Sequence, residues 1–167
     1  MNSRFVIKQN LDDAIAVMRK AGKWLLDSGK NPSRWWQLEN LNRDFLLQYA
    51  AKEEFYVLYK DDVPAAAAIL QLTQNSQDWE SVDHGQSHPA FFIHWLCVDH
   101  AFSGQGLSQK LVDYAAQKAK ENNISLLRVD TNASETKLRE LYEKLGFKLV
   151  GIANEGYRQT AFYQKSV

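Results

Sequence analysis

The sequence is poor in the features that mark several protein classes, and each shortage excludes one of them. Its 167 residues include a single cysteine, Cys97, so the chain cannot form an internal disulfide, and one thiol alone cannot build a zinc site. No apolar run approaches the length of a membrane span, and the N-terminus lacks the apolar core and cleavage site of a signal peptide. These absences predict a cytoplasmic protein without a metal and without membrane contact.

An excess of charge is also missing. Lys plus Arg and Asp plus Glu each number 20, which gives a formal net charge of +0 at pH 7. A protein that grips a nucleic-acid backbone normally carries a clustered positive excess. We therefore expect partners that are small molecules or proteins, and no nucleic acid.

The chain does contain enough apolar sequence to build one domain over residues 1–167. Apolar residues make up 45% and charged residues 24%, as in ordinary globular proteins, and the length is near that of a single domain. No internal repeat interrupts it. A homodimer is allowed by the sequence, which does not specify the oligomeric state.

The hydrophobic pattern predicts strands that alternate with helices. We expect a first helix capped by Asp12 or Asp13, a second helix near 33–52, and a polar loop over 73–89 that we interpret as a lid. An apolar strand at 90–98, a helix at 107–121 and a strand at 124–129 predict a parallel crossover. Further strands are expected at 5–7, 54–59, 65–72, 147–152 and 160–164, and a last helix begins with a capping box at 132–135 and ends at Gly146.

The turn between the apolar strand and the third helix has the composition of an anion site. It reads Ser103-Gly104-Gln105-Gly106-Leu107-Ser108, and glycines let an anion approach the N–H groups at a helix N-terminus. A dinucleotide fingerprint would need glycine at Gln109, and a P-loop would need Gly-Lys-Ser/Thr, which is absent. Taken alone, Gly-x-Gly also fits an ordinary tight turn.

Three motifs in order resemble the GCN5-related N-acetyltransferase (GNAT) family. They are Leu96-x-Val98, Ser103-x-x-Gly106-x-Ser108 and the run from Leu141 to Phe147, Leu-Tyr-Glu-Lys-Leu-Gly-Phe. Ser103, Ser108 and Glu135 depart from the residues usual in that family. The resemblance implies an α/β (α+β) fold with a mixed, mostly antiparallel sheet of six to seven strands, a central parallel pair and about four helices. It also implies acetyl-CoA as co-substrate and an amine as acceptor.

The resemblance assigns roles to residues around the cofactor. Backbone groups of Leu96, Cys97 and Val98 would hold the pantetheine, and the turn Ser103, Gly104, Gln105, Gly106, Leu107 and Ser108 would hold the pyrophosphate. Asn132 would replace the family's pantetheine-binding asparagine, or act only as a helix cap. Tyr142 would protonate the departing thiolate, or pack as a core aromatic.

The proton acceptor and the acceptor pocket are less sharply defined by the sequence. His94 is a candidate general base, with a satisfied core histidine as the equal alternative. Asp130 could bind an ammonium or serve as base, and otherwise forms part of a turn. Trp35 and Trp36 are candidates for an aromatic wall beside the acceptor; in the alternative, Trp36 packs in the core and Trp35 is partly exposed. We interpret Cys97 as a small buried hydrophobe and expect direct attack in a ternary complex.

Two other functions remain open at this stage. The same fold could use another acyl-CoA or an aminoglycoside-like acceptor, or the protein could be a non-catalytic acyl-CoA sensor. Tyr142 favours catalysis over sensing, because a sensor has no need of a general acid.

Overall fold

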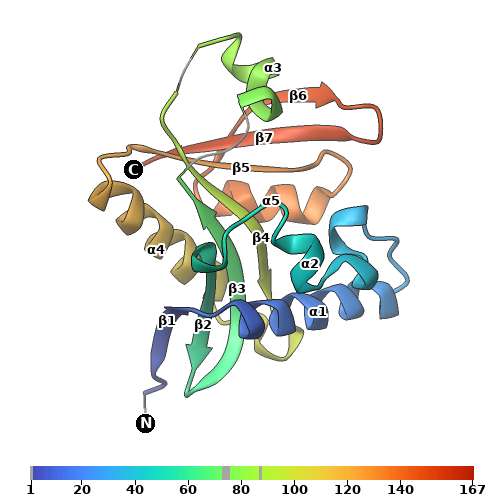
Figure 1. The fold of residues 1–167 in the computed structure, drawn as a ribbon, viewed down its shortest axis with the longest axis vertical. Coiled ribbons are helices and arrows are strands. Elements are labelled where there is room, and N and C mark those ends of the chain that lie inside the picture. The colour runs from blue at the N-terminus through green and yellow to red at the C-terminus, as the bar shows by residue number, and fades with distance from the viewer. Residues whose placement is uncertain (1, 73–75, 87) are drawn as a thin grey trace. The chain divides into compact units, whose positions relative to one another are not determined.

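The computed structural model describes residues 2–72, 76–86 and 88–167 (Figure 1). The chain groups into two compact units. The first unit is Met1–Leu70 with Trp95–Leu111, and the second is Gln71–His94 with Val112–Val167. The expectation of one domain over 1–167 stays a prediction.

Strands β1 (Phe5–Gln9), β2 (Phe55–Lys60) and β3 (Val63–Gln71) form an antiparallel meander that frames the first unit. Helix α1 (Leu11–Asp27) has a buried apolar face that joins the core of this unit with residues of β2 and β3. Its cap is Asn10, whose side chain accepts from the Asp13 N–H, so the expected cap at Asp12 or Asp13 is wrong by two residues or more. The expected first helix and the strands expected at 5–7, 54–59 and 65–72 are confirmed.

The expected long helix at 33–52 does not form. The segment breaks into the 3₁₀ turns η1 (Arg34–Trp36), η2 (Leu38–Asn40) and η3 (Lys52–Glu54) and a short α2 (Arg43–Leu46). The Arg19 guanidinium donates to the carbonyls of Leu38 and Leu41, at 2.9 and 3.1 Å, and Asn42 accepts from the Phe45 N–H. Side chains thus satisfy backbone groups that a continuous helix would have paired with each other.

In the second unit, β5 (Leu126–Asn132) pairs antiparallel with β7 (Gln159–Ser166), which pairs antiparallel with β6 (Lys148–Asn154). Strand β4 (Phe91–Val98) begins in this unit and ends in the first. Its residues Phe91 and Phe92 pair parallel with Leu127 and Arg128 of β5, which confirms the predicted crossover through α4 (Leu107–Glu121). The hydrogen-bonded strand order of the seven-stranded sheet is β1-β2-β3-β4-β5-β7-β6.

The expected loop at 73–89 is wrong over residues 76–83, while 73–75 and 87 lie outside the described residues. The turn η4 (Ser76–Trp79) and helix α3 (Glu80–Asp83) occupy this stretch. The Trp79 side chain is 1% exposed and packs with Phe92 and Phe162. Asp83 is held by two hydrogen bonds from Arg128 of β5. A polar sequence here hides one buried aromatic anchor.

Helix α5 (Thr136–Lys144) begins without the predicted capping box. Its N-cap Glu135 makes no side-chain cap bond, and the Asn132 Oδ1 instead accepts from the N–H and the hydroxyl of Ser134, at 3.0 and 2.8 Å. An asparagine that folds onto the residue two positions ahead forms a local turn and not a helix cap. The predicted stop is confirmed: Gly146 has φ +93.

Candidate functional site

The turn from Ser103 to Ser108 lies in the first unit and opens α4. Gly104 and Gly106 have φ +75 and +73, and a Cβ built on either would meet nothing within 4 Å. The Lys110 N–H makes the first helical bond, to the Gly106 carbonyl, so N–H groups earlier in the turn are outside the helical pattern. Glycine geometry, open space and a helix N-terminus together suit a phosphate group.

A lysine that the sequence analysis did not consider stands beside this turn. The Lys60 ammonium, at the end of β2, donates to the Gln105 side-chain oxygen. The two residues are 45 positions apart in the sequence, so the fold and not a local motif brings them together. A positive charge is thus attached to the candidate phosphate site, where Ser103 supplies none.

Within strand β4, Trp95 has φ +50. Such a backbone conformation costs an L-residue about 1–2 kcal/mol, so the surroundings must hold it in place. The Trp95 indole N–H donates to the Trp35 carbonyl at 2.9 Å, and the two rings meet edge to face at 5.8 Å. The apolar run at 90–98 gave no sign of this irregularity, because no glycine marks it.

Trp35 is the centre of an aromatic group in the first unit. Its ring meets Tyr49 edge to face at 5.1 Å and Phe45 at 6.1 Å, and the Arg34 guanidinium lies 4.3 Å from its centroid. The Tyr49 side chain is 43% exposed, so the group reaches the surface. Trp36, the other predicted wall residue, is half-buried and packs against the apolar core of this unit.

Cys97 follows the irregular part of β4 and is buried. Burial raises the pKa of its thiol to about 12, with a smaller contribution from the charge of Asp99. At neutral pH the sulfur is therefore a protonated thiol, and a thiol is a poor nucleophile. This chemistry favours the role of a small hydrophobe over that of an acetyl carrier.

We expect Cys97 in the native protein to react with a disulfide reagent such as Ellman's far more slowly than a free cysteine at pH 8. Burial limits the access of the reagent to the sulfur, and the raised pKa lowers the concentration of the thiolate that attacks the reagent. Addition of denaturant should release one full equivalent of reactive thiol. Rapid native labelling would contradict this placement.

In the second unit, Tyr142 lies on α5 and is 5% exposed. Its ring packs against Phe147 at 5.8 Å and Tyr163 at 6.0 Å. Asn132 ends β5 half-buried, and its Oδ1 is taken up by Ser134. Its amide nitrogen is the part of the side chain that these two bonds leave for another partner.

The other two predicted residues of this unit have defined neighbours. His94 is half-buried, and its ring lies parallel to that of Phe92 at 6.3 Å. Asp130 accepts from the Arg158 guanidinium at 3.2 Å, with side-chain exposures of 18% and 12%. The sequence analysis did not consider Arg158, because a hairpin arginine has no motif around it.

Among the described residues, no group of three or more His, Cys, Asp or Glu side chains is arranged to hold a metal ion. Over the same ranges, no helix is long and apolar enough to cross a membrane.

Comparison with known proteins places this geometry in a family context. A family model described as the acetyltransferase (GNAT) family matches residues 18–147. The chain is 22% identical over 155 residues to the uncharacterized N-acetyltransferase YesJ of Bacillus subtilis (strain 168), covering 90% of this chain and 83% of YesJ.

Solved structures share the fold. A GNAT-family acetyltransferase from Listeria monocytogenes 4b F2365 superposes with a TM-score of 0.72 at 23% identity, covering 98% of this chain and 95% of that one. The PaiA N-acetyltransferase of Thermoplasma acidophilum, solved in complex with coenzyme A, gives a TM-score of 0.70 at 16% identity, with 98% and 99% covered. At these identities the likeness concerns the fold.

Proposed function

Because the chain belongs to the acetyltransferase (GNAT) family, we propose that it transfers the acetyl group of acetyl-CoA to a primary amine by direct attack in a ternary complex. The turn Ser103–Ser108 carries this proposal. It joins two glycines of positive φ to a helix N-terminus and a neighbouring lysine, which is the chemistry a pyrophosphate requires. A similar fold solved with coenzyme A supports the same ligand.

The residues take part in the reaction as follows in this proposal. Backbone groups of Leu96, Cys97 and Val98 and the Asn132 amide hold the pantetheine. His94 takes a proton from the amine, whose nitrogen lone pair forms a bond to the carbonyl carbon while the carbon–sulfur bond breaks. Tyr142 donates a proton to the departing sulfur, so that the products are an amide and a neutral thiol.

In this proposal the acceptor contacts further side chains. The rings of Trp35 and Trp36, in the first unit, attract cationic or planar groups, as the Arg34 guanidinium on the Trp35 ring illustrates. The Asp130 carboxylate, in the second unit, binds an ammonium.

Replacing Gly106 by Ala should weaken the binding of coenzyme A about tenfold, which corresponds to ~1.4 kcal/mol. The added methyl would project into the open space above the turn, where the phosphate must approach the backbone. Isothermal titration calorimetry of the pure protein with coenzyme A measures the effect.

Gly29→Ala is the matched control for this substitution. Gly29 also lies in the first unit, has φ +79, and a Cβ there would meet nothing within 4 Å. It bears the same backbone strain but lies outside the turn, so its affinity for coenzyme A should equal that of the parent protein. Absence of any binding to the parent at millimolar coenzyme A would overturn the proposed function itself.

A further inference from the structure

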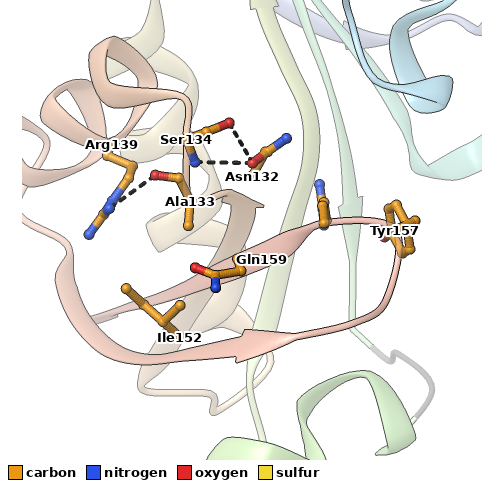
Figure 2. Close-up of a pocket in the computed structure, with 8 residues that line it drawn as sticks. Asn132, Ala133, Ser134, Arg139, Ile152, Tyr157 and Gln159 are labelled. Atoms are coloured by element: carbon orange, nitrogen blue, oxygen red, sulfur yellow. Dashed lines mark hydrogen bonds between the residues drawn. The ribbon is translucent and has the colours of Figure 1, made fainter.

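A pocket of about 490 Å³ lies within the second unit, beside the β6–β7 hairpin (Figure 2). Figure 2 shows Asn132, the last residue of β5, and the following Ala133 and Ser134 facing Ile152 and Gln159 of the hairpin. Its lining residues are Asn132, Ala133, Ser134, Arg139, Ile152, Tyr157, Arg158 and Gln159. Two of the eight are arginines and none is acidic, although the protein as a whole is neutral.

Hydrogen bonds hold both guanidinium groups in place, and only one of the four acceptors is a carboxylate. Arg139 donates from Nε to the Tyr163 hydroxyl at 2.9 Å and from Nη1 to the Ala133 carbonyl at 3.1 Å. Arg158 donates from Nε to the Thr160 hydroxyl at 3.0 Å and from Nη2 to Asp130 at 3.2 Å. Each side chain is therefore oriented before any ligand arrives.

Each arginine also keeps donors in reserve. Within the part of the chain that the structure describes, no acceptor bonds to the Nη2 of Arg139 or to the Nη1 of Arg158. Asp130 neutralises Arg158 in part, whereas the two contacts of Arg139 are with uncharged oxygens. One positive charge at the pocket is thus without a counter-ion among these contacts.

We propose that this pocket binds a carboxylate group, and that it holds the carboxylate of an acceptor that also carries the amine. This role in holding the acceptor rests on the proposed function. Oriented guanidinium donors bind planar carboxylates through paired hydrogen bonds. The amide of Gln159 adds a neutral donor, and the Ile152 side chain and the Tyr157 ring give an apolar wall for a short carbon chain.

The charge of the pocket favours a carboxylate group over phosphate as its ligand. Asp130 already shares Arg158, so the pocket offers about one uncompensated positive charge, enough for one monoanionic carboxylate group. A ligand that inserts a single carboxylate should therefore bind more tightly than inorganic phosphate, whose dianion carries both charges on one group.

The test uses calorimetric titration with glutarate, inorganic phosphate and 1,5-diaminopentane. None of the three carries both a carboxylate and an amine, so the titration measures binding to one kind of group at a time. We expect millimolar glutarate to bind, phosphate to bind more weakly and the diamine to give no heat at this pocket. Gln159→Glu should abolish glutarate binding, because it places a carboxylate in the lining at an exposed position that tolerates it. The exposed Gln117→Glu on α4 changes the net charge equally and should bind glutarate as the parent does.

Arg139→Gln and Arg158→Gln should each weaken glutarate binding at least about tenfold. Both arginines also make structural contacts, so melting temperatures are recorded alongside, and Gln159→Glu keeps the test valid if either variant unfolds. Equal binding of glutarate by the parent and Gln159→Glu, or tighter binding of phosphate than of glutarate, would overturn the proposal.

A kinetic arm separates this proposal from the proposed function. With acetyl-CoA, β-alanine should give a higher kcat/KM than propylamine, and Gln159→Glu should remove that preference by lowering kcat/KM for β-alanine. If no amine is acetylated while glutarate still binds, the pocket stands and the transferase proposal falls. Equal kcat/KM for the two amines would show that the pocket does not hold the carboxylate of the acceptor.

Discussion

Replacing Tyr142 by Phe is expected to lower kcat for acetyl transfer by about a hundredfold or more, which is the usual contribution of a positioned general acid. The substitution removes the phenolic proton proposed for the departing sulfur and keeps the ring that packs against Phe147 and Tyr163. The folded structure and the affinity for coenzyme A should therefore change little. The rate of thiol release, followed with a chromogenic thiol reagent and propylamine as acceptor, measures the effect.

Tyr163→Phe is the matched control. Tyr163 is a fully buried tyrosine that contacts the Tyr142 ring, and its hydroxyl serves Arg139. Its loss should leave kcat with propylamine near the parent value. Two results together would show that Tyr142 is a packing residue and that the proposed acid is wrong. One is a parent value of kcat in Tyr142→Phe. The other is an equal gain in rate for both proteins when the thioester carries a more acidic leaving thiol.

Arg128→Met is expected to lower the free energy of unfolding by about 3–5 kcal/mol, as breaking a buried ion pair from one side commonly does. The Arg128 side chain is 3% exposed and donates to both oxygens of Asp83, at 2.9 and 2.6 Å. The guanidinium also lies 4.4 Å from the centre of the Trp79 ring. Its removal leaves the Asp83 carboxylate, 13% exposed, without its partner, as denaturant unfolding at pH 7 should reveal.

The exposed pair of Arg43 and Asp12 gives the comparison for this variant. It has a similar contact, 2.9 Å from Nε to Oδ1, but its side chains are 61% and 72% exposed. Arg43→Met should cost no more than about 1 kcal/mol. Equal losses at the two sites would show that burial is not what makes the Arg128 contact strong.

The same pair gives a pH dependence of defined sign. The hydrogen bonds from Arg128 hold the pKa of Asp83 below its ordinary value of 3.8, so the ionised carboxylate is favoured in the folded state. The stability from this pair is present above pH 3.8 and is lost as the pH falls through the lowered pKa. The difference in the free energy of unfolding between the parent protein and Arg128→Met should therefore become smaller below pH 3.8, as denaturant unfolding at several pH values should show.

The regular elements could be predicted from the sequence because their patterns are local. The apolar spacing along α4 and the glycine after α5 follow directly from helix geometry, and the structure confirms both. The parallel crossover followed from the order of the elements. The turn at 103–108 was recognisable because glycine is the residue that such backbone angles require.

What the sequence did not predict depends on contacts between distant residues. Arg19 takes carbonyls from the expected second helix, and Trp79 is drawn from a polar stretch into a core of phenylalanines. The strained backbone at Trp95 depends on the carbonyl of Trp35. The cation at Lys60 contacts a side chain 45 positions away, at Gln105. No local pattern records any of these partners.

The short turns between Arg34 and Glu54 have a consequence for how such a protein can diversify. Their shape depends on a few side-chain bonds, above all those of Arg19 and Asn42, and not on a continuous ladder of backbone bonds. A substitution at Arg19 would remove its bonds to the Leu38 and Leu41 carbonyls without changing an aromatic residue or a strand. In the proposed transferase, a single change on α1 is therefore a route to a different acceptor that leaves the turn at 103–108 unchanged.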